Sequence, residues 1–118
     1  QPKIFLLSSQ TKWDKDLNFF ADQNFQIIHD INLHSIINQI NEQEINSILI
    51  EAGPKLVNAF LSEGLCDELI VYEAPKNLND DYINWFDNEH FLDSHGFELK
   101  SDYTIGSDIK RIYKYAKK

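Results

Sequence analysis

With 118 residues, the sequence is long enough for one domain with a hydrophobic core and too short for two. Its net charge of −8 argues against a nucleic-acid partner, because proteins that bind polyanions draw their affinity from clustered lysine and arginine. No apolar run approaches the roughly 20 residues that cross a bilayer, and the single cysteine, Cys66, has no internal partner for a disulfide. We therefore expect a soluble, cytoplasmic protein that neither enters a membrane nor binds nucleic acid.

The N-terminal part of the sequence alternates apolar runs with helical patterns. Apolar runs at 4–7 and 25–29 predict two buried strands, and we expect a short, poorly patterned helix between them around 13–20. Asn32 then precedes a segment whose apolar residues recur at i, i+3, i+4 and i+7, so a helix with Asn32 as its N-cap is predicted. The apolar residues of that helix are Leu33, Ile36, Ile37 and Ile40.

A strand, a tight turn and a helix are predicted in the middle of the sequence. The apolar run Ser47–Glu51 has the pattern of a strand, and it ends in a carboxylate. Pro54 suits the first position of a helix, where its missing amide proton costs nothing, and Gly64 is suited to end that helix. A further strand is predicted over 67–72. The buried face of the predicted helix is formed by Leu56, Val57, Phe60 and Leu61.

The C-terminal part of the sequence changes in character. Residues 76–96 are mostly polar, and after them apolar and polar residues alternate from Phe97 to Tyr103. A turn at 105–107 and a last strand over 109–115 complete an antiparallel hairpin. The order of elements predicts an α/β fold, with a mostly parallel sheet, flanking helices and a C-terminal antiparallel hairpin.

The carboxyl end of the predicted strand at 47–51 is the best candidate for a ligand site, because open α/β sheets bind ligands at such strand ends. Glu51 is suited to accept hydrogen bonds from ligand hydroxyls, although capping the next helix or pairing with a lysine explains it equally well. The backbone amides of Gly53, Lys55 and Leu56 have the arrangement of an anion site at a helix N-terminus. An ordinary strand-to-helix turn is the simpler interpretation of the same residues.

Other polar and aromatic residues have simpler structural explanations. Cys66 is expected to be a partly buried apolar filler, and the spacing of the four histidines does not match a zinc site. Asp80 and Asp81 are typical of a solvated turn. Trp85 and Phe86 are expected to anchor a long loop on the core, and a lid over a ligand is the alternative.

Three segments of the sequence together resemble a known family. ILIEAGPKLVNAFL at 48–61, GLCDEL at 64–69 and APK at 74–76 resemble the reductase domain of the bifunctional riboflavin-biosynthesis deaminase-reductases. That family has a strand ending in Glu-Gly-Gly-Pro, a Leu-x-x-Ala-Phe-Leu helix, a Leu-Val-Asp-Glu-Leu strand entry and an Ala-Pro-Lys exit. The match is strong over about thirty residues, and the flanking elements agree in order and length.

The resemblance implies a dihydrofolate-reductase-like fold, an NADPH cofactor and a homodimeric full-length enzyme. The family reduces the ribose of 5-amino-6-(5-phosphoribosylamino)uracil, and hydride goes to C1 of the ring-opened sugar. By the same resemblance Glu51 contacts the ribose of this phosphoribosylaminopyrimidine substrate. We predict no metal site in this chain, and its catalytic residues are not assigned. The residues that it assigns to the cofactor are Gly53, Pro54, Lys55, Leu56, Val57, Asn58 and Ala59.

The sequence departs from the family in two respects. Ala52 replaces the first glycine of Glu-Gly-Gly-Pro, so a Cβ stands where the family brings the backbone close to the cofactor. The opening strand of the family's reductase domain, its further Arg, Thr and Asp ligands and its zinc deaminase signature are missing, and the sequence contains no methionine. We therefore expect residues 1–118 to be a single domain, the C-terminal part of a reductase domain, which is inactive alone.

Two alternatives stay open. A stand-alone relative that acts on the 2,5-diamino pyrimidine has the same motifs, and an upstream deaminase signature would distinguish the two. A non-catalytic binding or dimerisation module on the same scaffold is the other, and Ala52 modestly favours it. Binding of NADPH separates this module from a reductase.

Overall fold

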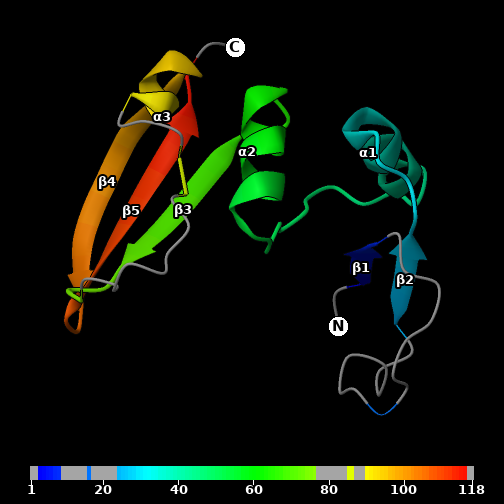
Figure 1. Ribbon diagram of the computed structural model, residues 1–118, viewed down its shortest axis with the longest axis horizontal. Helices are drawn as coiled ribbons and strands as arrows, with labels where there is room; N and C mark the ends of the chain where they lie inside the picture. Colours follow the sequence, from blue (N-terminus) through cyan, green and yellow to red (C-terminus); the bar gives the residue numbers. More distant parts are fainter. Residues whose placement is uncertain (1–2, 9–15, 17–23, 77–84, 87–89, 117–118) are drawn as a thin grey trace. The chain divides into compact units, whose positions relative to one another are not determined.

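The computed structural model describes residues 3–8, 16, 24–76, 85–86 and 90–116. The chain divides into two compact units, Gln1–Ile48 and Leu49–Lys118, and each is described by itself (Figure 1). Among the described residues, no helix combines the length and hydropathy needed to span a membrane. The elements are β1 (Ile4–Leu7), β2 (Phe25–Ile28), α1 (Leu33–Asn41), α2 (Pro54–Ser62), β3 (Glu68–Glu73), α3 (Phe91–Ser94), β4 (Phe97–Ile105) and β5 (Asp108–Tyr115).

The first unit contains a parallel pair of strands and one helix. β1 and β2 pair in register from Ile4 opposite Phe25 to Leu7 opposite Ile28. The helix α1 follows β2, and its buried residues are spaced at i, i+3 and i+7, so that they lie on one face. The buried residues of this unit are Ile28, Leu33, Ile36 and Ile40.

A small hydrogen-bond network fixes the N-terminus of α1. The side chain of Asn32 accepts from the amide of Ser35 at 2.9 Å, which is the capping bond that the sequence predicts. Asp30 accepts from the Asn32 amide at 3.0 Å and from the hydroxyl of Ser35. These hydrogen bonds lower the pKa of Asp30 below its ordinary value of 3.8, and the bond from the Ser35 hydroxyl is the largest cause.

We expect this network to make the stability of the fold depend on acidic pH through Asp30. Because the folded-state pKa is depressed, the carboxylate stabilises the fold above the unfolded value of 3.8, and this contribution is lost as the pH falls through the lower folded pKa. In Asp30→Asn, the free energy of unfolding should therefore fall less than in the parent between about pH 7 and about pH 3, measured by denaturant titration. Glu42→Gln, at the exposed C-cap of α1, is the control and should follow the parent.

In the second unit, the helix α2 has clear signals at both ends. Pro54 occupies its first position, and Gly53 is its N-cap. At the other end Gly64 has φ 69°, and two bonds close a Schellman motif: the amide of Gly64 donates to Leu61 O at 3.2 Å and that of Leu65 to Phe60 O at 3.0 Å. Only glycine adopts this left-handed conformation without strain, so the predicted end of the helix at Gly64 is confirmed.

The second unit also contains a three-stranded antiparallel sheet in the order β3-β5-β4 (Figure 1). β5 pairs with β3 from Lys114 opposite Glu68 onward, and with β4 along its whole length. A two-residue turn joins β4 to β5, and its first residue, Gly106, has φ 61°. The predicted C-terminal hairpin is therefore confirmed.

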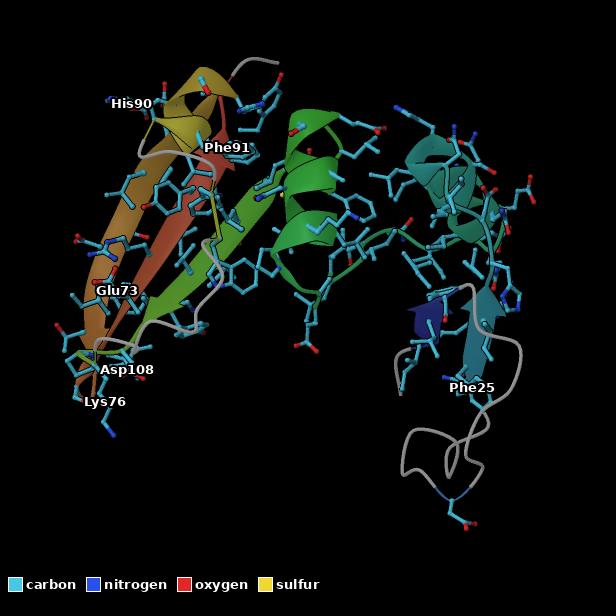
Figure 2. The ribbon with its side chains drawn as sticks, viewed as in Figure 1. Phe25, Glu73, Lys76, His90, Phe91 and Asp108 are labelled. Atoms are coloured by element: carbon cyan, nitrogen blue, oxygen red, sulfur yellow. The ribbon has the colours of Figure 1, made fainter. Side chains whose placement is uncertain are left out.

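The core of the second unit lies where α2 and α3 meet one end of this sheet. Leu61, Phe91 and Phe97 are buried together at its centre. Figure 2 shows Phe91 at this end of the sheet, whereas Glu73 and Asp108 lie at the opposite end, near the turn between β4 and β5. The partly buried residues packed against this cluster are Val57, Cys66, Leu69, Phe86, Leu92, Tyr113 and Tyr115.

One predicted strand is wrong. Residues 45–53 lie outside the helices and strands, and Leu49 is 80% exposed. An apolar run satisfies the side-chain pattern of a strand, but a strand also needs a neighbouring backbone to accept its hydrogen bonds. The orientation of β3 differs from the prediction for the same reason, because its partner is the antiparallel β5. The helix predicted around 13–20 and the turn at 80–81 fall outside the described residues, apart from Asp16.

Candidate functional site

Glu51 lies in the extended segment that leads into α2, two residues before the N-cap Gly53. Its side chain is exposed, and no described residue forms a hydrogen bond or ion pair with its carboxylate. The two structural explanations for Glu51, a helix cap and a surface ion pair, therefore find no support among the described residues. The carboxylate is open to solvent and able to accept hydrogen bonds from a ligand.

The N-terminus of α2 offers backbone donors beside Glu51. The first amides of an α-helix have no acceptor within the helix, and here Pro54 carries no amide proton and Gly53 carries no capping side chain. The amides of Lys55 and Leu56 are left at the helix N-terminus, where the helix dipole favours an anion.

This turn fits a phosphate group such as the one that a nicotinamide dinucleotide carries. Gly53 and Lys55 are exposed, and a Cβ added at Gly53 would meet no atom of the described residues within 4 Å, so these residues leave the approach at Gly53 open. The remaining residues of the predicted cofactor segment are partly buried: Pro54, Leu56, Val57, Asn58 and Ala59. Val57 packs against the core, whereas the exposed residues at the turn, Gly53 and Lys55, are left for a ligand.

Asn58 links α2 to the segment at Trp85 and Phe86, a contact that the sequence does not predict. Its side-chain amide donates to the backbone oxygen of Trp85 at 2.5 Å. Its own oxygen, Oδ1, is buried and has no partner in the described part of the chain. Asn58 and Trp85 are 27 residues apart, and no local sequence signal announces such a bond.

The two aromatic residues of that segment have different roles. Phe86 stacks on Phe91, with ring centroids 5.6 Å apart, and packs against the core cluster, which confirms the predicted anchor. Trp85 is 50% exposed, so the same prediction fails for it. Cys66 packs against the core cluster as predicted, and burial raises the pKa of its thiol. In the described part of the chain, no group of three or more His, Cys, Asp and Glu side chains is arranged to hold a metal.

Comparison with known proteins identifies the scaffold. The family model of the RibD C-terminal domain matches residues 1–111. This chain belongs to the RibD C-terminal domain family. The riboflavin biosynthesis protein RibD of Escherichia coli K12 is 40% identical over 82 residues, which cover 67% of this chain and 22% of that protein.

Two further relatives place the match within the family. A protein of Buchnera aphidicola from Acyrthosiphon pisum, named 5-amino-6-(5-phosphoribosylamino)uracil reductase, is 31% identical over 112 residues, which are 92% of this chain and 53% of that protein. The structure of Acinetobacter baumannii RibD, form 2, has a TM-score of 0.74 and 24% identity, and the match covers 96% of this chain and 37% of that one. The α/β fold of a RibD C-terminal domain is therefore confirmed, and the chain spans about half or less of these relatives.

The alanine at position 52 provides a test of the turn in this RibD C-terminal domain. Ala52 precedes the N-cap of α2 and is partly buried. Removing its Cβ lets the backbone approach a bound phosphate more closely. We expect Ala52→Gly to keep or improve the affinity for NADPH in the full-length protein, measured by calorimetric titration. A clear loss of affinity would contradict the predicted role of this turn in cofactor binding.

Proposed function

We propose that this chain provides part of the active site of an NADPH-dependent 5-amino-6-(5-phosphoribosylamino)uracil reductase of riboflavin biosynthesis. The observation that carries the proposal is the match to the RibD C-terminal domain over residues 1–111. The similarity to the Buchnera aphidicola reductase over 92% of this chain supports the same reaction. In this chain the exposed carboxylate and the open helix N-terminus are available to the substrate and the cofactor respectively.

Glu51 is the substrate residue of the proposal. A ring-opened ribose carries several hydroxyl groups, and an exposed carboxylate is a strong acceptor for them. Because no described residue occupies this carboxylate, it does not have to give up a bond within the protein when a sugar binds. Its role is to orient the sugar so that C1 faces the reducing group.

The segment Gly53–Ala59 is the cofactor part of the proposal. The amides of Lys55 and Leu56 bind a phosphate of NADPH, and the ammonium group of Lys55 adds a positive charge at the exposed end. When bound, NADPH supplies the hydride that reduces the sugar carbon. The contribution of the protein is to bind and orient the two molecules, which is how positioning lowers the barrier to such a transfer.

The proposal includes three statements about the whole enzyme. Residues 1–118 alone do not catalyse turnover, since the chain spans only 53% of the Buchnera aphidicola reductase. The full-length enzyme is a homodimer, as expected from the family. It works in the cytoplasm, where a reductase of riboflavin biosynthesis meets its substrate and NADPH.

The test compares the full-length protein with residues 1–118 alone. Each is incubated with NADPH and 5-amino-6-(5-phosphoribosylamino)uracil, and oxidation of NADPH is followed by absorbance. We expect the full-length protein to oxidise NADPH only when the pyrimidine is present, and the chain alone to show no turnover. Turnover by the chain alone would contradict the incomplete site. A full-length protein that does not bind NADPH would contradict the proposed function and favour a non-catalytic module.

A further inference from the structure

Trp85 is exposed to solvent, although the next residue, Phe86, packs against the core. Phe86 packs on Phe91 in the core, whereas half of the surface of Trp85 is exposed. Tryptophan is highly buried on average in folded proteins, because its indole ring carries a large apolar area. The indole of Trp85 is half-exposed beside the partly buried ring of Phe86, so its surface is available to a ligand.

The backbone of Trp85 is held at α2 by a specific bond. The Asn58 side chain donates to the Trp85 carbonyl at 2.5 Å, and its Oδ1 is left buried without a partner in the described residues. A buried, unpaired oxygen destabilises the fold. An apolar residue at position 58 would avoid the cost of a buried, unpaired oxygen. The hydrogen bond that Asn58 donates to Trp85 therefore explains why an asparagine is present here.

The bond places Trp85 next to the proposed phosphate turn. Residues three and four apart share a helix face, so Asn58 lies on the face of Pro54 and Lys55, one turn from the start of α2. Helical side chains also lean toward the N-terminus. The bond therefore holds the backbone oxygen of Trp85 at Asn58, which is about one helical turn, a rise of about 5.4 Å, from the start of α2.

We propose that Trp85 stacks on a heteroaromatic ring of the nicotinamide dinucleotide, and that Asn58 is the positioning residue that holds it at the first turns of α2. The inference rests on the proposed function, because it needs a dinucleotide at this turn. When a flat aromatic ring stacks on the exposed indole, the facing surfaces of both rings are removed from water. Such stacking strengthens binding and does not depend on which aromatic ring is bound.

The test is calorimetric titration of NADPH into the full-length protein and its variants. Trp85→Ala should weaken NADPH binding about ten-fold, and Trp85→Phe, which keeps an aromatic face, should retain most of the affinity. Tyr103→Ala is the matched control: Tyr103 is 46% exposed on β4, so this variant should bind NADPH like the parent. If Trp85→Ala does not fold, Trp85→Leu keeps the apolar bulk without the aromatic face and should show the same weakening.

A double variant separates positioning from general stability. Asn58→Leu removes the donor, so it should weaken NADPH binding, and adding Asn58→Leu to Trp85→Ala should produce no loss beyond that of Trp85→Ala alone. The adenine and nicotinamide halves are then titrated separately, as adenosine 2′,5′-bisphosphate and reduced nicotinamide mononucleotide. The half of the dinucleotide that stacks on Trp85 should bind Trp85→Ala more weakly than the parent, and the other half should bind both proteins equally well.

Three results would overturn the inference about Trp85 and Asn58. They can be distinguished from a result that contradicts the proposed function, because in each of them the parent still binds NADPH. If the parent binds NADPH but a folded Trp85→Ala binds it equally well, Trp85 is not a stacking residue. If Trp85→Ala weakens only the pyrimidine substrate, the ring belongs to the substrate. If the losses of Asn58→Leu and Trp85→Ala add, Asn58 does not act through Trp85. A parent that does not bind NADPH at all contradicts the proposed function itself.

Discussion

Replacing Phe97 by alanine is expected to lower the free energy of unfolding by about 3–5 kcal/mol. Phe97 is 1% exposed, and it is the most deeply buried side chain of the cluster that joins α2, α3 and the sheet. Its ring lies 5.6 Å from that of Tyr115, between centroids, on the neighbouring strand. Truncation leaves a cavity between several helices and strands. Because these elements relax only partly around the cavity, its cost adds to the lost burial of the ring. Denaturant titration measures the loss.

Leu99→Ala is the matched control for Phe97→Ala. Leu99 is on the same strand, two residues later, but it is 48% exposed, so its truncation removes little buried area and should cost far less. Equal losses in the two variants would contradict the placement of the core. Phe97 is remote from Glu51 in sequence and shares no bond with it. Under conditions in which Phe97→Ala is still folded, the variant should therefore keep the ligand affinity of the parent.

In contrast to Phe97→Ala, Glu51→Gln is expected to have a large effect on activity and little effect on stability. Loss of a charged acceptor for the ribose hydroxyls should lower kcat/KM of the full-length protein by about ten- to a hundred-fold. The melting temperature should stay near that of the parent, because the carboxylate is exposed and no described residue binds it. Steady-state kinetics with NADPH and the phosphoribosylaminopyrimidine give the first quantity, and thermal unfolding gives the second.

The control for Glu51→Gln is Glu42→Gln, which removes another exposed carboxylate, at the end of α1. It should change neither kcat/KM nor the melting temperature. If Glu51→Gln retains full kcat/KM, Glu51 does not contact the reacting sugar, and the substrate part of the proposed function is wrong.

The parts of the fold that the sequence predicted are those with local signals. The cap at Asn32, the first turn at Pro54 and the glycine end at Gly64 each depend on a few neighbouring residues. The C-terminal hairpin depends on alternation and on one turn at 106–107, so it was equally accessible. Such features are encoded by side-chain bonds and backbone conformations that do not need the rest of the chain.

The parts that the sequence did not predict depend on partners far away in the chain. Residues 47–51 have the apolar pattern of a strand, yet a strand forms only when another backbone completes its hydrogen bonds. The antiparallel pairing of β3 with β5 joins segments about forty residues apart, Glu68 with Lys114 at one end. In the same way, the family motif led to Glu51 and the turn after it, whereas only the structure revealed the bond from Asn58 to Trp85.

The most direct test of the proposed reductase activity follows the hydride itself. The full-length protein is incubated with 5-amino-6-(5-phosphoribosylamino)uracil and NADPH that carries deuterium at the transferable C4 position, and the product is analysed by mass spectrometry and NMR. We expect a ribityl product with one deuterium at C1 of the former sugar, and much less of it with Glu51→Gln. A protein that consumes no NADPH with this substrate, or a product without deuterium at C1, would contradict the proposed reductase activity.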